Sequence, residues 1–478
     1  MTLCLAIDQG TTSTKAFRWR PGTDIEPAGS LTHRQIYPQP GWVEHDPREL
    51  LAHVRTLVGN TPDATALALA NQGETVVMWH ARTHEPLANA IVWQDLRTRD
   101  MIERLRAEGA EKVTLARAGL PLDPYFSASK MRWLLDNVPG ARSLAAAGDL
   151  RIGTSDAFFL DSLTGTFATD ISTASRTSLM NLRTGAWDAE LCALFDIPLS
   201  CLPEIRATLG PFGQIADGPA VVASIVDQQA SLFGHDCKEP RDIKITFGTG
   251  AFILGITGAD PVVRPASGML ATVAWMFDGT PTYALDGGVL CAGAAIEWGR
   301  SVGVIDTLSP VWDPADRCAD RGLFFVPALN GLGAPTWDRD ARGSWTGLER
   351  TTRREDLGRA IWEGVGLRAH QVVAAFEQAS GARCGRISVD GGMCRSAAFR
   401  QFLADLFRRD IHFVDHGDLT AAGLLRLCAR ALGSGQMPPL FWRRTRPRHP
   451  VPDGAIAAFA ALTARPAGPI TPTEESPA

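Results

Sequence analysis

The sequence predicts an α/β protein with at least two domains. Short apolar strands alternate with longer helical patterns along the chain, which is typical of that fold class. The 478 residues exceed the size at which one hydrophobic core keeps growing. A strand, a Gly-Thr turn and a second strand occur near the start of each half, in AIDQGTTSTKAF and ITFGTGAFILG. We therefore expect one such hairpin in each domain and a ligand site in the cleft between them.

Two segments of the first half carry clear signals of secondary structure. The stretch TALALANQGETVVMWH predicts a strand, a polar turn and a second strand. In HDPRELLAHVRTLV, Asp46 is a good helix cap, Pro47 suits the first helical position, and Glu49 follows the cap by three residues. These residues predict the start of a helix.

The second half predicts a strand that runs into a double-glycine turn, in ISVDGGM, and then an amphipathic helix. We interpret the aromatic residues of this helix as core packing. Its apolar face would carry Phe399, Phe402, Leu403, Leu406 and Phe407, with Arg400, Asp405 and Arg408 pointing away.

The polar stretch DCKEPRDIK, at 236–244, predicts the main domain boundary. We expect an N-terminal domain over 1–238 and a C-terminal domain over 239–435. The remainder, 436–478, is rich in Pro, Arg and Ala, and we expect it to be disordered.

Composition and charge narrow the class of partner. Lys and Arg number 47 and Asp and Glu 52, for a net charge of −5, and the only concentrated basic stretch is the short WRRTRPRH. These values argue against a nucleic-acid partner.

The start, MTLCLAID, lacks the basic region of a signal peptide, and no run of 18 mostly apolar residues predicts a membrane span. Nine scattered cysteines without a C-x-x-C pair favour buried thiols, so we expect a cytoplasmic protein without membrane association.

Both Gly-Thr turns would present backbone N–H groups and hydroxyls at one place. Glycine removes the Cβ that would keep an oxygen-rich ligand away. Each turn alone is also compatible with an ordinary hairpin. Their pairing, together with the Asp-Gly-Gly turn at 390–392, favours a polyphosphate held from two sides.

Ten stretches in the family's order make the chain resemble the FGGY family of carbohydrate kinases, and within it the members that phosphorylate glycerol. The resemblance implies an α/β, two-domain actin-like, sugar kinase and Hsp70 (ribonuclease H-like) ATPase fold with an interdomain cleft. It also implies ATP and Mg²⁺, a small polyol or sugar as substrate, and a homodimer or homotetramer. The stretches are DQGTTSTKAF, QIYPQPGWVEHDP, NQGET, NAIVWQDLRT, DPYFSASK, ASRTSLMN, DQQASLFG, FGTGAF, GLGAPTWDRDARG and VDGGM.

The resemblance assigns the catalytic roles to two aspartates. Asp8 would hold Mg²⁺ through water, because a carboxylate beside a phosphate needs a cation between them. Asp227 would accept the proton of the substrate hydroxyl and also lie at the metal. Either residue could instead have a structural role, Asp8 in starting a turn and Asp227 in capping a helix.

The remaining roles divide between substrate and nucleotide. Glu74, Tyr125 and Gln228 resemble partners of substrate hydroxyls, while Trp93 and Phe252 resemble apolar walls against the carbon chain. Each aromatic residue taken singly could be an ordinary core residue. The residues implied to contact the nucleotide are Thr11, Thr12, Ser13, Gly248, Thr249, Gly250, Gly293, Gly391, Gly392 and Ser396.

The sequence departs from the family pattern at Gly73. Family members that act on glycerol usually read N-Q-R-E-T, whose Arg contacts a hydroxyl, whereas this chain reads NQGET. Loss of a charge-assisted hydrogen bond, about 1.5–3 kcal/mol, would weaken glycerol roughly tenfold to a hundredfold. We also expect the missing side chain to open space, so a tetritol, pentitol or ketopentose is the alternative substrate.

Two smaller departures concern regulation and the nucleotide. The stretch ADGPAVVA lacks the basic residues that bind a sugar bisphosphate inhibitor in some relatives, so we expect no such regulation. Ser396 stands where relatives often have Asn. A non-kinase ATPase of the same fold would share the phosphate hairpins but lack NAIVWQD, DPYF and DQQASLFG, and a catalytically dead scaffold would lack Asp8 or Asp227.

Overall fold

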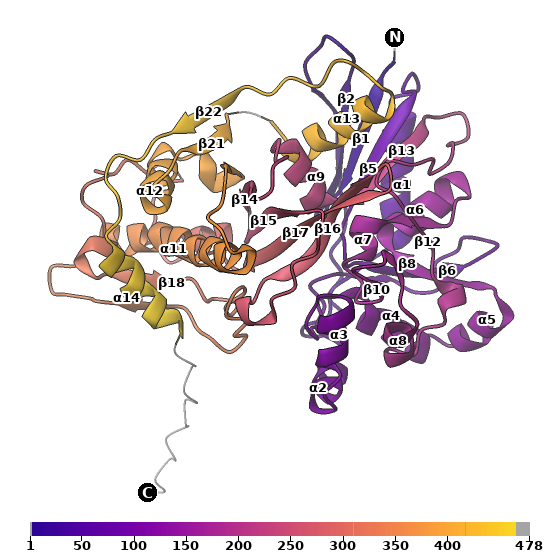
Figure 1. Cartoon of the computed structure of the whole chain (residues 1–478), viewed down its shortest axis with the longest axis horizontal. Coiled ribbons are helices and arrows are strands. Elements are labelled where there is room, and N and C mark those ends of the chain that lie inside the picture. Colours follow the sequence, from indigo (N-terminus) through magenta and orange to yellow (C-terminus); the bar gives the residue numbers. More distant parts are fainter. Residues whose placement is uncertain (1, 309, 416, 465–478) are drawn as a thin grey trace, which may run out of the picture.

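The computed structural model describes residues 2–464 except 309 and 416. Two large sheets with flanking helices lie beside each other, the first built from the N-terminal half and the second from the C-terminal half (Figure 1). The sequence prediction of an α/β fold is confirmed. The connection between helix α9 (Asp227–Gly234) and strand β14 (Ile243–Phe247) contains the boundary predicted after residue 238, which stays a prediction.

The first large sheet has the strand order β13-β5-β1-β2-β3. Strand β1 pairs antiparallel with β2 and parallel with β5, and β13 extends the parallel part. The predicted hairpin of the first half is therefore present. The strand bounds are β1 Cys4–Gln9, β2 Ser13–Trp19, β3 Glu26–Thr32, β5 Ala66–Asn71 and β13 Ala220–Val226.

The two faces of this sheet bury different side chains. Leu5, Ile7 and Leu67 pack with helices α1 (Pro47–Gly59) and α6 (Ser155–Thr164). Alanines and Cys4 line the opposite face, which packs against α9 and α13 (Leu419–Ala431). The predicted start of α1 is confirmed, since Asp46 caps the helix by accepting from the backbone N–H of Arg48 at 2.9 Å.

A smaller sheet, ordered β4-β7-β6-β8, carries the helices that approach the cleft from the first half. The two strands predicted in TALALANQGETVVMWH are confirmed as β5 and β6, but they belong to different sheets. The strands are β4 Glu44–His45, β6 Val76–His80, β7 Ala90–Ile91 and β8 Leu150–Thr154, and the helices are α2 Arg99–Ala107, α3 Glu111–Arg117, α4 Ser127–Asn137 and α5 Ala141–Ala147. Between this sheet and β13 lie β9 Ala168–Asp170, α7 Ile171–Ala174, β10 Met180–Asn181, β11 Ala186–Trp187, α8 Ala189–Leu194 and β12 Glu204–Arg206.

The second large sheet repeats the arrangement of the first, with the order β16-β17-β15-β14-β20-β21-β22. Strand β14 pairs antiparallel with β15 and parallel with β20, as β1 does with β2 and β5. The strand bounds are β15 Ala251–Gly258, β16 Leu270–Phe277, β17 Thr280–Val289, β20 Ile387–Asp390, β21 Ile411–Val414 and β22 Trp442–Thr445. Also in this half are β18 Phe324–Val326, β19 Ser344–Thr346, α10 Gly293–Ser301, α11 Arg354–Ser380, α12 Ala397–Phe407 and α14 Asp453–Ala464.

The expectation of disorder beyond residue 436 is wrong for the last two elements, β22 and α14. Strand β22 pairs antiparallel with β21, and Phe459 of α14 is buried against Phe324, with ring centroids 5.8 Å apart.

The orientation of Asp405 in α12 also differs from the prediction. The side chain does not point to solvent, because its carboxylate accepts the backbone N–H groups of Arg448 at 2.6 Å and His449 at 3.0 Å. Proline-rich composition hid these contacts, which only the fold brings together. Residues 465–478 of the predicted tail lie outside the described residues.

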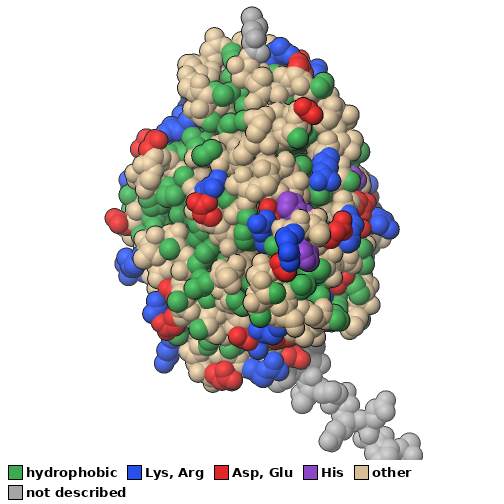
Figure 2. All heavy atoms as spheres, turned by 90° about the vertical axis from the view of Figure 1, so that its right-hand side faces the viewer, with side chains coloured by type: hydrophobic (Ala, Val, Ile, Leu, Met, Phe, Trp, Pro, Cys, Tyr) green, Lys and Arg blue, Asp and Glu red, His purple; other side chains and the backbone are tan. Residues whose placement is uncertain are grey.

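The charged surface and the cysteines can be compared with what the composition predicted. Charged side chains of both signs are interspersed on the face of the molecule that Figure 2 shows. All nine cysteines are buried free thiols, as the spacing predicted. Within residues 2–464, apart from 309 and 416, no helix is both long and apolar enough to cross a membrane.

Helices α9 and α13 cross at two glycines, and this contact joins the two halves of the chain. A Cβ on Gly234 would lie 1.8 Å from the carbonyl oxygen of Leu419, and one on Gly423 would lie 1.9 Å from that of Ala230. Backbone atoms cannot yield to such contacts without separating the helices. Glycine is therefore required at both positions.

We predict that Gly423→Ala lowers the free energy of unfolding by at least about 1–3 kcal/mol, the usual cost of overpacking. The matched control is Gly59→Ala at the end of α1, where a Cβ would meet nothing within 4 Å. Chemical denaturation of the two variants measures the difference. Equal stability of Gly423→Ala and the parent protein would show that the helices separate at no cost.

Candidate active site

Three acidic residues lie at or just beyond the ends of three neighbouring parallel strands. Asp8 lies near the end of β1, Glu74 follows β5, and Asp227 follows β13. Strands β1 and β13 both pair with β5, so Asp8 and Asp227 lie about two strand spacings, roughly 10 Å, apart along the same edge. The topology thus gathers residues that are more than 60 positions apart in the sequence at one edge of the sheet.

Like charges meet at this edge. Burial, followed by the carboxylates of Asp418 and Asp227, raises the pKa of Asp8 to about 8, while Lys15 acts in the opposite direction. Lys15 itself forms an ion pair with Asp418 at 3.3 Å. The Oδ1 atom of Asp8 is buried and has no hydrogen-bond partner. An unpaired carboxylate among other carboxylates is a place where a cation is stabilised.

This arrangement fits Mg²⁺ rather than a metal enclosed by protein ligands. Among the described residues, no group of three or more His, Cys, Asp or Glu side chains could hold a metal ion. Mg²⁺ keeps several water ligands and is usually bound through one or two carboxylates and the phosphates of a substrate. Asp8 would hold it, with Asp227 nearby, and this assignment stays a prediction.

Three side chains form hydrogen bonds to Thr11 in the first glycine turn, residues 10–12. The carbonyl of Thr11 accepts from His33 Nε2 at 2.7 Å and from Gln35 Nε2 at 2.8 Å. The hydroxyl of Thr11 accepts from the indole N–H of Trp93 at 3.0 Å. Trp93 therefore contacts the predicted phosphate turn directly.

The two predicted apolar walls, Trp93 and Phe252, contact each other. Trp93 lies edge-to-face with Tyr125 and with Phe252, at centroid distances of 5.7 and 6.3 Å. Trp93 and Tyr125 come from the first half of the chain and Phe252 from β15 of the second. The three aromatic residues, taken singly, resembled core residues, but the fold brings them into contact with one another.

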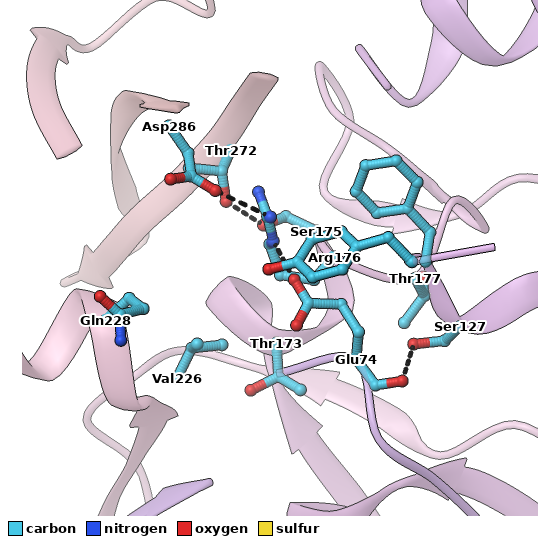
Figure 3. Close-up of polar contacts among 12 residues, drawn as sticks. Glu74, Ser127, Thr173, Ser175, Arg176, Thr177, Val226, Gln228, Thr272 and Asp286 are labelled. Carbon is cyan, nitrogen blue, oxygen red and sulfur yellow. Dashed lines mark hydrogen bonds and ion pairs between the residues drawn. The ribbon is translucent and has the colours of Figure 1, made fainter. Parts of the chain in front are cut away.

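Glu74 is held by an ion pair that spans the two halves (Figure 3). Arg176, in the turn after α7, donates from Nε to Glu74 Oε1 at 2.7 Å and from Nη2 to Asp286 Oδ2 at 2.9 Å. Asp286 belongs to β17 of the second sheet. Burial and then the Glu74 carboxylate raise the pKa of Tyr125, so its hydroxyl stays protonated and can donate.

The expectation that Gly73 opens space is wrong. A Cβ on Gly73 would lie 2.9 and 3.1 Å from the two γ carbons of Val226 and 3.5 Å from Cγ of Arg176. The side chain of Val226 fills the volume that the sequence left unassigned, and the stem of Arg176 lies beside it. The sequence could not show this, because Val226 is 153 residues away (226 − 73).

Asp227 is the first residue of α9 and does not cap it. Val226 occupies the cap position, and Asp227 Oδ1 accepts from the backbone N–H of Gln228 at 2.6 Å. Burial, followed by the charge of Glu74, raises the pKa of Asp227 to about 6, and Lys244 opposes the shift. A carboxylate with such a pKa is mostly ionised at neutral pH and suits a general base.

The nucleotide glycines pack against the second hairpin turn, residues 248–250. A Cβ on Gly293 would lie 2.5 Å from the carbonyl oxygen of Gly248, and one on Gly391 would lie 2.3 Å from that of Phe247. Gly391 also has a φ of 93°, which favours glycine. The turns at 248–250, 293 and 391–392 thus form one surface. Their contact with a nucleotide stays a prediction.

Ser396 has a clear structural role. Its hydroxyl caps α12 by accepting from the backbone N–H of Phe399 at 3.2 Å, and the residue is 2% exposed. A serine in this position satisfies the helix end. Contact with the adenine, which the resemblance implies, is not tested by this geometry.

Three cationic residues of the site were missed by the sequence reasoning, and so were Asp286 and Asp418, the partners of two of them. Arg176 lies within the stretch ASRTSLMN, and Lys15 within the first hairpin, so both were close to quoted residues. Lys244 lies in the apolar strand IKITF, where a single Lys is a sign of a buried charge. The ion-pair partners of Arg176 and Lys15 are at least 102 positions away in the sequence, and Gln228, the partner of Lys244, belongs to a different element, so no role could be assigned.

Comparison with known proteins agrees with the geometry. The family model described as the N-terminal domain of the FGGY family of carbohydrate kinases matches residues 3–234, and that of the C-terminal domain matches residues 243–432. The glycerol kinase of Alkalilimnicola ehrlichii is 41% identical over 450 residues, covering 91% of each chain. The glycerol kinase of Methylobacterium nodulans is 40% identical, covering 95% of each.

Solved structures share the fold. The Plasmodium falciparum glycerol kinase with ADP superimposes with a TM-score of 0.90 at 28% identity, covering 98% of each chain. The ligand-bound xylulose kinase of Lactobacillus acidophilus gives a TM-score of 0.83 at 21% identity, covering 97% of this chain and 96% of that one. The second likeness concerns the fold alone.

We predict that Gly73→Ala raises the KM for the polyol substrate about tenfold or more, because the new Cβ displaces Val226, the residue before the predicted base. The double variant Gly73→Ala/Val226→Ala removes both γ carbons and should recover most of the loss. Steady-state kinetics of the two variants tests this. An unchanged KM in Gly73→Ala would mean that the space beside Gly73 is open.

Proposed function

This chain belongs to the FGGY family of carbohydrate kinases and is an ATP-dependent kinase, and from that premise we propose that it phosphorylates glycerol. The observation that carries the proposal is the placement of Asp227 at the sheet edge shared with Asp8 and Glu74, where burial and the Glu74 charge raise its pKa to about 6. Relatives named glycerol kinase at about 40% identity over nine-tenths of the chain support glycerol as the substrate.

The proposed reaction needs one proton acceptor and precise placement of two substrates. Asp227 takes the proton of a glycerol hydroxyl while that oxygen bonds to the γ-phosphorus of ATP, and the bond from phosphorus to the β–γ bridging oxygen breaks. The products are glycerol phosphate and ADP. The base contributes roughly 10²–10⁴-fold, and positioning and charge stabilisation supply most of the remaining acceleration.

The other residues orient the substrate and exclude water. Glu74, Tyr125 and Gln228 would bond the hydroxyls, and Trp93 and Phe252 would cover the carbon chain. The main-chain N–H groups of the turns at 10–12 and 248–250 would hold the phosphates. Mg²⁺, when bound beside Asp8, supplies neutralisation of phosphate charge.

Glycerol is favoured over a longer polyol or sugar. A longer substrate would need open space next to Gly73, and Val226 fills that space. The chain has both Asp227 and Glu74 at the sheet edge, and the buried Arg176 places a guanidinium against Glu74. We infer a compact pocket for a three-carbon polyol.

Assembly and location are also proposals. A homodimer or homotetramer is the expected assembly of a chain with this resemblance, and light scattering would distinguish the two from a monomer. A cytoplasmic location is supported by the nine buried free thiols. Fractionation of cells would test it.

We predict that Asp227→Asn lowers kcat at least roughly 10²-fold, because Asn cannot accept the proton. Binding of ADP should remain within about twofold, since the nucleotide surface lies on the second sheet. Kinetic assays and calorimetry with ADP and Mg²⁺ measure both quantities. Turnover close to that of the parent protein would remove Asp227 from the role of base.

We predict that Asp8→Asn raises the Mg²⁺ concentration needed for half-maximal activity about tenfold or more. The reason is that the substitution removes the negative charge whose Oδ1 atom is buried without a partner. Activity is measured over a Mg²⁺ titration at saturating ATP and glycerol. A titration curve identical to that of the parent protein would show that Asp8 does not hold the metal.

The substrate itself is tested with a panel of polyols of three to six carbons. We expect kcat/KM for glycerol to exceed that for each longer polyol by about tenfold or more, since a missing or extra group of this kind is worth roughly 10–200-fold. A thermal shift screen with an ATP analogue and Mg²⁺ provides an independent ranking. Preference for a longer polyol would overturn the proposed substrate and leave the kinase assignment intact.

A further inference from the structure

A buried lysine of the second sheet contacts Gln228, the residue that follows the predicted base. Lys244 of β14 is fully buried, and its ammonium donates to Gln228 Oε1 at 2.5 Å and to Thr246 Oγ1 at 3.1 Å. Burial lowers its pKa, and the carboxylates of Asp390, Asp227 and Asp286 oppose the shift. Burying an ammonium group is costly unless it is paired, so these contacts make the position tolerable.

The strand places this lysine against α9. Lys244 and Thr246 alternate with the core residues Ile243 and Ile245, and therefore point to the other face of β14. On that face Thr246 is paired with Phe252 of β15 and with Asp390 of β20. The contact from Lys244 to Gln228 thus links the first turn of α9 to the strand that leads into the second phosphate turn.

Lys244 fixes which way the Gln228 amide points. Its carbonyl oxygen accepts from the ammonium at 2.5 Å, and the Gln228 side chain also lowers the pKa of the neighbouring Asp227 carboxyl. A carboxylate accepts hydrogen bonds only, so with the oxygen held by Lys244 the NH₂ end is the group that Gln228 can offer to Asp227. The reversed amide would place its NH₂ against the ammonium of Lys244, and that contact would be repulsive.

We propose that Lys244 is a positioning residue that acts through Gln228. Its ammonium holds the amide oxygen, so that the NH₂ end stays turned towards Asp227 and the substrate hydroxyl. This keeps the base oriented and gives the pocket a neutral hydrogen-bond donor next to the acidic Asp227. The inference rests on the proposed function, because the hydroxyl concerned is that of the polyol.

The position of Lys244 has a second interpretation, in which the lysine merely stabilises the fold. It could offset the charges of the nearby aspartates without acting on Gln228. The two roles differ in one measurable respect. A lysine that acts through Gln228 loses its importance once Gln228 is removed, whereas a general electrostatic or folding role persists.

A double-mutant cycle with Lys244→Met and Gln228→Leu separates these roles. In the parent background we expect Lys244→Met to weaken glycerol binding, measured by calorimetry with ADP and Mg²⁺ present, and to lower kcat/KM roughly tenfold to a hundredfold, the effect of a charge-assisted hydrogen bond. In the Gln228→Leu background the same substitution should cost less than about threefold. Equal losses in both backgrounds would overturn the proposal.

Two controls keep the test interpretable. Lys238→Met changes an exposed lysine six positions before Lys244 and should leave both quantities unchanged. ADP binding within about twofold of the parent protein shows that the variants are folded. If Lys244→Met fails to bind ADP, Gln228→Glu serves instead. Its carboxylate still pairs with Lys244 but offers no NH₂ end, so parent-like glycerol binding by this variant would overturn the proposal.

The outcome is independent of whether glycerol is the right substrate. The parent protein is first assayed with glycerol and with longer polyols. If it prefers another polyol, the proposed substrate is wrong, and the same cycle is run with the preferred one. Coupling between positions 244 and 228 then still decides the role of Lys244.

Discussion

The structure depends on holding several carboxylates close together at one edge of a sheet. Burial, followed by the charges of Asp418 and Asp227, raises the pKa of Asp8 to about 8. Three parallel strands create this edge, because β1, β5 and β13 all end there. A folded chain would avoid such repulsion unless a bound cation or a chemical task required it, and the same repulsion prepares the edge for a cation and a polyphosphate.

Cationic side chains counter these charges, and each of them links the two halves of the molecule. Arg176 joins Glu74 to Asp286, and Lys15 joins the first hairpin to Asp418 at the start of α13. Lys244 joins β14 to the helix that carries Asp227. The charge balance of the site is therefore complete only when the halves are together. A site closed by these contacts would also exclude water, which would favour transfer to a polyol over hydrolysis of ATP.

Close backbone contacts at glycines fix the position of the elements that carry the site. The crossing of α9 and α13 leaves no room for a Cβ at Gly234 or Gly423, so the helix that starts with Asp227 has one position relative to the second half. In the second half, Gly293 and Gly391 pack against the backbone of residues 247–248 in the same way. These glycines act through backbone proximity. Their importance is invisible in a pattern of apolar and polar residues, where they resemble ordinary turn or helix residues.

The sequence alone determined the local elements and the chemistry that they carry. The two hairpins, the capped start of α1 and the strand before Gly391 follow from residues adjacent in the chain. The order of the ten stretches that resemble the family pointed to the kinase family, with its base and metal carboxylate. Tertiary structure decided what fills each space and what neutralises each charge. Val226 closes the gap at Gly73, Asp405 turns inward to the backbone at 448–449, and Lys244 reaches Gln228. Such contacts join residues from separate elements, and their distances depend on strand order and helix packing rather than on spacing along the chain.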